Sequence, residues 1–145
     1  MTIICWDGTT LAADKRATYS GMICTVTKIH RVNGLLVGGS GDSCHILALI
    51  EWVREGRKIE KFPKHQEDKD DSVSLLVVEL DGTTSSYERT PYPIKYEQRN
   101  VCIGSGREYA RAALHLGCNS SDAVSVAIAL DSGCGNGIDT LTLEG

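Results

Sequence analysis

Thr2 could act as a nucleophile, because a threonine at a mature N-terminus carries a hydroxyl and a free amine on one residue. The hydroxyl is a weak nucleophile until a base takes its proton. An α-amine in an unstructured peptide has a pKa of about 7.7–8.0, which suits that role near neutral pH. Met1 must first be removed, which a small second residue permits. A Met-Thr start is common, so other residues have to support this chemistry.

Lys28 lies where it could support an oxyanion site. The Asn33-Gly34 pair predicts a two-residue hairpin turn, which sets Lys28 opposite Gly39. The strand continues into Ser40-Gly41, where the backbone is free to approach a ligand closely. A cation beside backbone N–H donors is the arrangement that stabilises a developing negative charge.

The position of Asp14 relative to Thr2 depends on the first hairpin turn, Asp7-Gly8. A two-residue turn there sets Thr2 opposite Ala13 and leaves Asp14 on the other face of the strand. A G1 bulge at Gly8 would shift the pairing by one residue and set Thr2 opposite Asp14. Both registers are compatible with the sequence.

Turn signals and apolar runs predict strands that pair in antiparallel hairpins, with turns at Asp7-Gly8, Asn33-Gly34 and Asp81-Gly82. Strands are expected at residues 2–6, 9–14, 23–32, 35–37, 73–80, 83–88, 101–103 and 138–143. The polar residues 14–21 are expected to form a loop.

Three helices follow from the apolar periodicity. The first begins after a cap at Asp42 or Ser43 and ends at Gly56, and the second begins after Gly106 and ends at Gly117. The third begins after a cap at Ser120 or Ser121 and ends at Leu130. Residues 57–71 hold ten charged side chains in fifteen and are expected to form a solvated loop, or at most a frayed helix. Strands and helices come in separate blocks, so the expected fold class is α+β, with one domain over residues 1–145.

Composition argues against several classes of protein. A net charge of −4 gives no reason to expect nucleic acid or an anionic membrane as a partner, and no apolar run is long enough to span a bilayer. The start lacks the features of a signal peptide, so a cytoplasmic location is expected. The six cysteines are expected to be reduced and mostly buried. No metal site is expected, because no Cys-x-x-Cys occurs and the histidines are not spaced as ligands.

Several short motifs occur along the chain in the order of a known superfamily. They are Thr2-Ile3-Ile4, Ala13-Asp14-Lys15-Arg16-Ala17-Thr18, Thr27-Lys28-Ile29, Gly38-Gly39-Ser40-Gly41-Asp42, Gly104-Ser105-Gly106 and Asp131. Together they resemble the proteasome β-subunit and HslV peptidase superfamily of N-terminal nucleophile hydrolases, and look closest to its short members from some bacteria and their phages. The resemblance spans nearly the whole chain. It implies a four-layer αββα sandwich of two antiparallel sheets flanked by helices.

The resemblance implies roles for particular positions. Thr2 would be the nucleophile, with its own amine as proton acceptor. Lys28 would favour ionisation of the Thr2 hydroxyl, and Asp14 would keep Lys28 charged and oriented. The backbone N–H of Gly41 would help to stabilise the oxyanion, and Arg16 would support Asp14.

The resemblance also implies that Ser105 and Asp131 hydrogen-bond around the Thr2 amine. Relatives usually have a serine three residues after the aspartate, where this chain has Cys134, and a thiol is a weaker hydrogen-bond donor. Each residue also has a structural interpretation: Ser105 could cap a helix, Asp131 could end one, and Asp14 could cap a loop. Lys28 could be a solvated strand residue. Their joint occurrence in family order favours the catalytic interpretation.

The implied function is a threonine peptidase that cleaves peptides or unfolded protein without a metal or cofactor. Homo-oligomers, in rings or related assemblies, and an ATP-dependent unfoldase are the implied partners. Residues 57–71 stand where relatives have a second long helix that often contributes to ring contacts, so the geometry of assembly stays open. Two alternatives remain: a non-proteolytic amidohydrolase of the same class, and a catalytically silent structural ring subunit.

Overall fold

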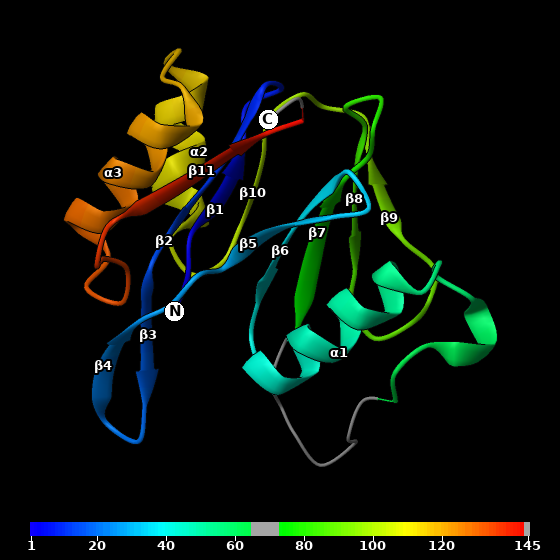
Figure 1. Ribbon diagram of the computed structural model, residues 1–145. Helices are drawn as coiled ribbons and strands as arrows, with labels where there is room; N and C mark the ends of the chain where they lie inside the picture. Colours follow the sequence, from blue (N-terminus) through cyan, green and yellow to red (C-terminus); the bar gives the residue numbers. More distant parts are fainter. Residues whose placement is uncertain (65–72, 144–145) are drawn as a thin grey trace.

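A computed structural model describes residues 1–64 and 73–143, which form four layers (Figure 1). Helices α2 (Arg107–His115) and α3 (Ser120–Leu130) cover the outer face of one sheet, and helix α1 (Ser43–Arg54) covers the other sheet. The two sheets face each other between these helices. This architecture confirms the predicted α+β class and the αββα sandwich.

The strands of both main sheets pair antiparallel to one another. The first sheet has the order β10-β1-β2-β11, with bounds Val101–Ile103, Ile4–Trp6, Thr10–Asp14 and Ile138–Thr142. The second has the order β5-β6-β7-β8-β9, with bounds Ile29–Val32, Leu35–Ser40, Ser74–Val78, Thr84–Tyr87 and Ile94–Tyr96.

Strand β1 is buried on both faces, which explains its uninterrupted apolar run. Ile3 and Cys5 belong to the core under α2 and α3, whereas Ile4 and Trp6 belong to the core between the sheets. Alternate residues of a strand point to opposite faces, so a strand in a middle layer needs apolar residues at every position. Thr2 is therefore held next to a strand that is anchored on both sides.

The segment expected to be a loop over residues 14–21 instead contributes a strand to a further hairpin. Strands β3 (Arg16–Tyr19) and β4 (Met22–Thr25) pair around Ser20-Gly21, where the φ angles are 51° and 80°. Two positive φ angles are typical of the type I′ hairpin turn. The hairpin extends beyond the two sheets (Figure 1). The expected strand at residues 23–32 is interrupted between Thr25 and Ile29, and Lys28 lies in that break.

Two smaller expectations need correction, and a third is only partly covered by the described residues. Strand β9 was not expected, because Thr90-Pro91-Tyr92-Pro93 breaks the apolar pattern before it. Asn119, and neither serine that follows it, caps α3 by accepting the N–H of Asp122. Within the charged segment 57–71, Ile59–Lys61 forms a 3₁₀ turn, and residues 65–71 lie outside the described residues.

The first hairpin turns at Gly8-Thr9, one residue later than expected. The N–H of Asp7 donates to the carbonyl of Thr10 at 3.3 Å, and Gly8 has a φ of 97°. The Asp7 carboxylate accepts the N–H groups of Thr9 and Thr10 at 2.9 and 2.8 Å. These Asx-type hydrogen bonds stabilise a turn at Gly8-Thr9 in place of the expected turn at Asp7-Gly8.

The later turn changes the register of β1 against β2. Ile4 pairs with Ala13, so Ile3 lies opposite Asp14, and the N–H of Asp14 donates to the carbonyl of Ile3 at 3.2 Å. Neither of the two expected registers is present: Thr2 is opposite neither Ala13 nor Asp14. Among the residues that the structure describes, no helix is long and apolar enough to cross a membrane.

Candidate active site

Thr2 lies just before β1 and is held against the segment that follows β10. Its backbone N–H donates to Ser105 Oγ at 3.2 Å, and its carbonyl accepts the N–H of Gly106 at 3.2 Å. Gly104 has a φ of 102°, and a Cβ there would come within 2.1 Å of the Thr2 carbonyl oxygen. The first glycine of the Gly-Ser-Gly motif is therefore needed for the backbone of Thr2 to approach so closely.

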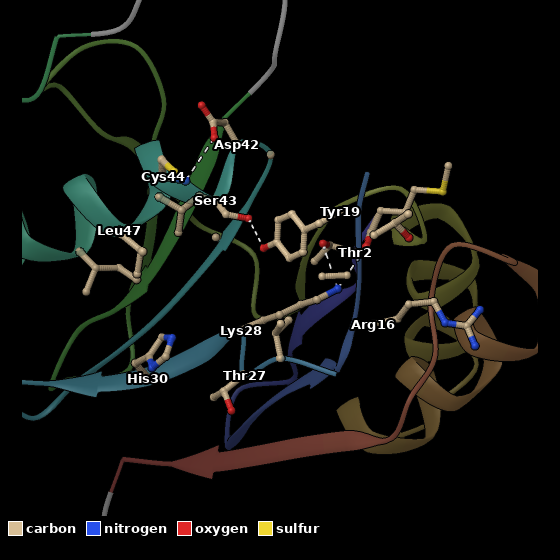
Figure 2. Close-up of a pocket in the computed structure, with 18 residues that line it drawn as sticks. Thr2, Arg16, Tyr19, Thr27, Lys28, His30, Asp42, Ser43, Cys44 and Leu47 are labelled. Carbon is tan, nitrogen blue, oxygen red and sulfur yellow. Dashed lines mark hydrogen bonds between the residues drawn. The ribbon is translucent and has the colours of Figure 1, made fainter. Parts of the chain in front are cut away.

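The Lys28 ammonium lies beside the Thr2 hydroxyl. Lys28 Nζ is 3.2 Å from Thr2 Oγ1 (Figure 2). It is also 2.8 Å from Asp14 Oδ1 and 3.1 Å from the carbonyl oxygen of Met1. The Lys28 side chain is only 8% exposed. The pairing of Ile29 with Gly38 in β5 and β6 continues the register that sets Lys28 opposite Gly39, as the Asn33-Gly34 turn predicts. The break before β5 lets Lys28 reach Thr2 from the neighbouring sheet.

Asp14 ends β2 and is fully buried. Its Oδ1 accepts from Lys28 and from the N–H of Ile3 at 3.1 Å, while its Oδ2 accepts the N–H groups of Arg16 and Gly135 at 3.2 and 3.0 Å. Four donors satisfy a buried carboxylate. Asp14 therefore holds Lys28 in place without facing Thr2 across the hairpin.

Ser105 and Asp131 form a hydrogen-bond chain that leads to the backbone nitrogen of Thr2. Ser105 Oγ donates to Asp131 Oδ2 at 2.8 Å, and the N–H of Gly133 donates to Asp131 Oδ1 at 2.9 Å. The Gly133 N–H, followed by the Ser105 hydroxyl, lowers the pKa of Asp131 below its ordinary value. Asp131 is thus a carboxylate at neutral pH, linked to Thr2 through Ser105.

Cys134 contacts Asp131 with its thiol, at an Sγ–Oδ2 distance of 3.5 Å. Burial, together with the charges of Asp14 and Asp131, raises the pKa of this thiol to about 12. The group is therefore a neutral, weak donor. The contact that the sequence left in doubt is present.

The Arg16 side chain points away from Asp14, which it meets only through its backbone N–H. Its guanidinium donates to the carbonyl of Ser132 at 2.8 Å and to Asn136 Oδ1 at 3.1 Å. Asn136 in turn donates to the Cys24 carbonyl and to Thr25 Oγ1 at 3.0 and 3.1 Å. Asn136 thus ties the β3–β4 hairpin to the loop that carries Asp131. Sequence reasoning missed this residue; the only local signal is an Asn-Gly pair, and Asn136 has a φ of 65°.

A pocket of about 820 Å³ opens beside Thr2. One wall comes from β3, and the other from residues 39–44, which include Gly41. Tyr19 Oη and Ser43 Oγ, 2.7 Å apart, join the two walls (Figure 2). Apolar side chains and one imidazole also line the pocket: Val26, His30, Ile46, Leu47 and Ile50. Burial, aided by the positive charge of Arg54, lowers the pKa of His30, which favours the neutral imidazole at physiological pH.

The sequence-predicted residues come together in one place, although they come from six separate segments of the chain. Hydrogen bonds link Thr2, Asp14, Lys28, Ser105, Asp131 and Cys134. Gly41 lines the same pocket as Thr2, and its φ is 117°. Within the described part of the chain, no cluster of three or more His, Cys, Asp or Glu residues could hold a metal ion.

Two curated proteins show sequence similarity over most of this chain, whereas no family model matches it. "Proteasome subunit beta 2" of Pyrococcus abyssi is 28% identical over 176 aligned positions, which cover 97% of this chain and 84% of the relative. "Proteasome subunit beta 1" of Thermococcus gammatolerans is 28% identical over 153 positions, which cover 89% of this chain and 74% of the relative.

Solved structures share the fold. A eukaryotic HslV from Trypanosoma brucei superposes with a TM-score of 0.72 at 21% identity, covering 97% of this chain and 98% of that one. A protein described as Thiobacillus denitrificans BPH superposes with a TM-score of 0.70 at 16% identity, covering 97% and 96%. The sequence relatives and the shared fold support assignment of the chain to the proteasome and HslV-like superfamily, as its motifs predicted.

Proposed function

We propose that this chain is an N-terminal nucleophile threonine peptidase, with Thr2 as the nucleophile after removal of Met1. One observation carries the proposal. A buried ammonium, Lys28 Nζ, lies between a buried carboxylate and a threonine hydroxyl that only one residue precedes in this sequence. A positive charge at hydrogen-bonding distance favours the ionised hydroxyl, which is the form that attacks a carbonyl.

Each step of the proposed reaction has a group available to it. The free amine of Thr2 takes the proton as Oγ1 attacks the carbonyl carbon of the scissile amide. The N–H of Gly41 helps to stabilise the oxyanion that forms. When the carbon–nitrogen bond breaks, the amine returns the proton to the leaving nitrogen. An ester on Thr2 remains, and water hydrolyses it with the same amine as base, which frees the acid and restores the enzyme.

Ser105 and Asp131 are positioning residues in this scheme. Ser105 Oγ already accepts from the nitrogen of Thr2, and Asp131 accepts from Ser105. Once that nitrogen is an amine, the same contact would orient its lone pair toward the hydroxyl. The nearby carboxylate would favour the protonated amine and so raise its pKa.

We propose peptides or unfolded protein as the substrate. The pocket beside Thr2 is about 820 Å³ and open to solvent, and apolar side chains form part of its lining, among them Val26, Ile46 and Ile50. Such a lining favours an apolar side chain next to the scissile bond. Two sequence relatives bear the name of proteasome subunits, which supports the choice of protein over a small amide.

We also propose that the chain assembles with copies of itself in the cytoplasm and receives substrate from an ATP-dependent unfoldase. The names of the relatives as subunits support an assembly. Light scattering on the purified protein tests it: a monomer mass at micromolar concentration would contradict self-assembly. An unfoldase partner predicts that folded substrates resist cleavage by the isolated protein while peptides do not.

Hydrolysis of fluorogenic peptide amides by the wild type and by Thr2→Ala, with intact masses of both, tests the proposed function. We expect an active wild type that has lost Met1, and a Thr2→Ala variant with no activity above background. Thr140→Ala, which alters an exposed threonine on β11, is the matched control and should keep wild-type activity. Full activity in Thr2→Ala, or in protein that retains Met1, would contradict the proposal.

A further inference from the structure

Two cysteines that the proposed chemistry does not use face each other across β1 and β10. Cys5 and Cys102 are directly paired in the antiparallel ladder, and their sulfur atoms are 3.2 Å apart. Directly opposite residues in such a ladder have Cα atoms roughly 4.5–5.5 Å apart. A disulfide needs a Cα separation of roughly 4.4–6.8 Å. The backbone of this strand pair therefore already has the spacing of a disulfide.

The two thiols differ in access to solvent. Cys5 is fully buried with Ile3 and Ala12 in the core under α2 and α3, whereas Cys102 is only partly buried at the edge of that core. β10 is an edge strand of its sheet, so a small oxidant can reach the Cys102 sulfur from that edge. Cys102 is therefore the thiol that a peroxide reaches first, and the Cys5 sulfur, 3.2 Å away, is placed to attack it once it is oxidised.

We propose that Cys5 and Cys102 form a reversible disulfide between β1 and β10 when the protein meets a peroxide. The Cys102 thiol reduces hydrogen peroxide, becomes a sulfenic acid and releases one water. The Cys5 sulfur then attacks the sulfenic sulfur; the S–S bond forms and a second water leaves. Two electrons pass from the thiols to the peroxide. A small thiol such as glutathione reverses the bond by exchange.

The bond would join the two strands that hold the nucleophile. Thr2 lies three residues before Cys5, and Ser105 three residues after Cys102, so the Thr2–Ser105 contact continues the same cross-strand register. The bond spans 97 residues of sequence. A cross-link over so long a loop restricts the unfolded chain and so stabilises the folded one. This inference holds whether or not Thr2 is a nucleophile.

Peptide mapping after oxidation tests the disulfide. The reduced full-length protein is titrated with hydrogen peroxide, quenched with N-ethylmaleimide in denaturant, digested and mapped without reduction. We expect one peptide pair joined through Cys5 and Cys102, a thermal unfolding midpoint that rises by several degrees, and reversal of both by dithiothreitol. Cys102→Ser and Cys102→Ala should give neither the linked pair nor the shift. Cys24→Ser, which removes a thiol on β4, should give both.

Two results would overturn the proposal. One is complete maleimide labelling of Cys5 and Cys102 at a peroxide dose that oxidises the exposed Cys44 and Cys118. The other is a rise of the unfolding midpoint that persists in the Cys102 variants, because that rise would then come from another site. Two different replacements at Cys102 separate loss of the bond from a packing defect, since the reduced variants should unfold at a midpoint close to that of the reduced wild type.

Discussion

Lys28 and Asp14 form an ion pair that is closed to solvent, with Nζ 2.8 Å from Oδ1 and side chains that are 8% and 0% exposed. The pair links the end of β2 in one sheet to the residue just before β5 in the other. Three backbone N–H groups also bind the Asp14 carboxylate, so its position does not depend on Lys28 alone. The ammonium is thereby held at the Thr2 hydroxyl.

Replacing Lys28 by methionine removes this charge and keeps most of the side-chain volume. We expect kcat for a peptide amide to fall by about 100-fold or more, because the hydroxyl loses the cation that favours its ionised form. The fold should persist, since Asp14 keeps its three backbone donors. Lys15→Met is the matched control: Lys15 also pairs with an aspartate, Asp139 at 2.7 Å, but does not line the pocket. Equal losses in the two variants would argue that only stability is affected.

The charge of Asp131 is predicted to set the acidic limb of the pH profile. The Thr2 amine must be neutral to accept a proton, so activity falls as the pH drops below the pKa of that amine. A nearby carboxylate raises the pKa of an amine, so Asp131→Asn should lower the pKa of the Thr2 amine. The acidic limb of kcat/KM should then move to lower pH, on the order of half a unit. Asp122→Asn, on the exposed first turn of α3, should leave the limb in place. A limb that moves to higher pH in Asp131→Asn would contradict the account.

The hydrogen bond between Tyr19 and Ser43 joins the two walls of the pocket, and we expect a peptide that binds between these walls to displace it. A hydrogen bond between partly solvated groups contributes about 0.5–1 kcal/mol, which corresponds to roughly 2- to 5-fold in an equilibrium constant. We therefore expect Tyr19→Phe and Ser43→Ala each to lower KM by that factor with little change in kcat. The double variant should show no further gain. Additive effects in the double variant would indicate that the two residues act separately.

Asp7 is predicted to stabilise the fold in a pH-dependent way. Burial opposes its charge, but hydrogen bonds from Ser120, Thr10 and Thr9 outweigh that effect and lower the pKa of Asp7 to about 2. Because the folded-state pKa lies below the unfolded one, the stabilisation is complete above about pH 5 and is lost as the pH falls through 4 toward 2. Asp7→Asn should lower the free energy of unfolding by about 1 kcal/mol at pH 7. Urea unfolding should show this difference shrinking below pH 4; a difference that grows there would contradict the assignment.

Local signals were enough to predict much of the fold. The Asn33-Gly34 turn has φ angles of 52° and 82°, as a type I′ turn requires, and this short turn alone sets the position of Lys28 opposite the glycines of β6. Strand β10 and the apolar faces of the helices were likewise predictable, because periodicity and glycine stops act within a few residues.

Some contacts that position the site join residues far apart in the sequence and could not be predicted from it. The Asp7 carboxylate, besides its local hydrogen bonds in the first turn, accepts the N–H of Ser120 at 2.8 Å, 113 residues away. Turn and capping patterns involve only neighbouring residues, so they cannot predict the contact with Ser120. Asn136 joins the β3–β4 hairpin to the Asp131 loop through atoms from three segments, so its role follows only from the tertiary arrangement.

Covalent trapping would show directly whether Thr2 is the nucleophile. A peptide-like β-lactone opens when an activated hydroxyl attacks it and leaves an ester that carries the full mass of the reagent. We expect a single adduct, mapped to an N-terminal Thr2, formed much more slowly in Lys28→Met and absent in Thr2→Ala. An adduct on another residue, or none on protein that has lost Met1, would contradict it.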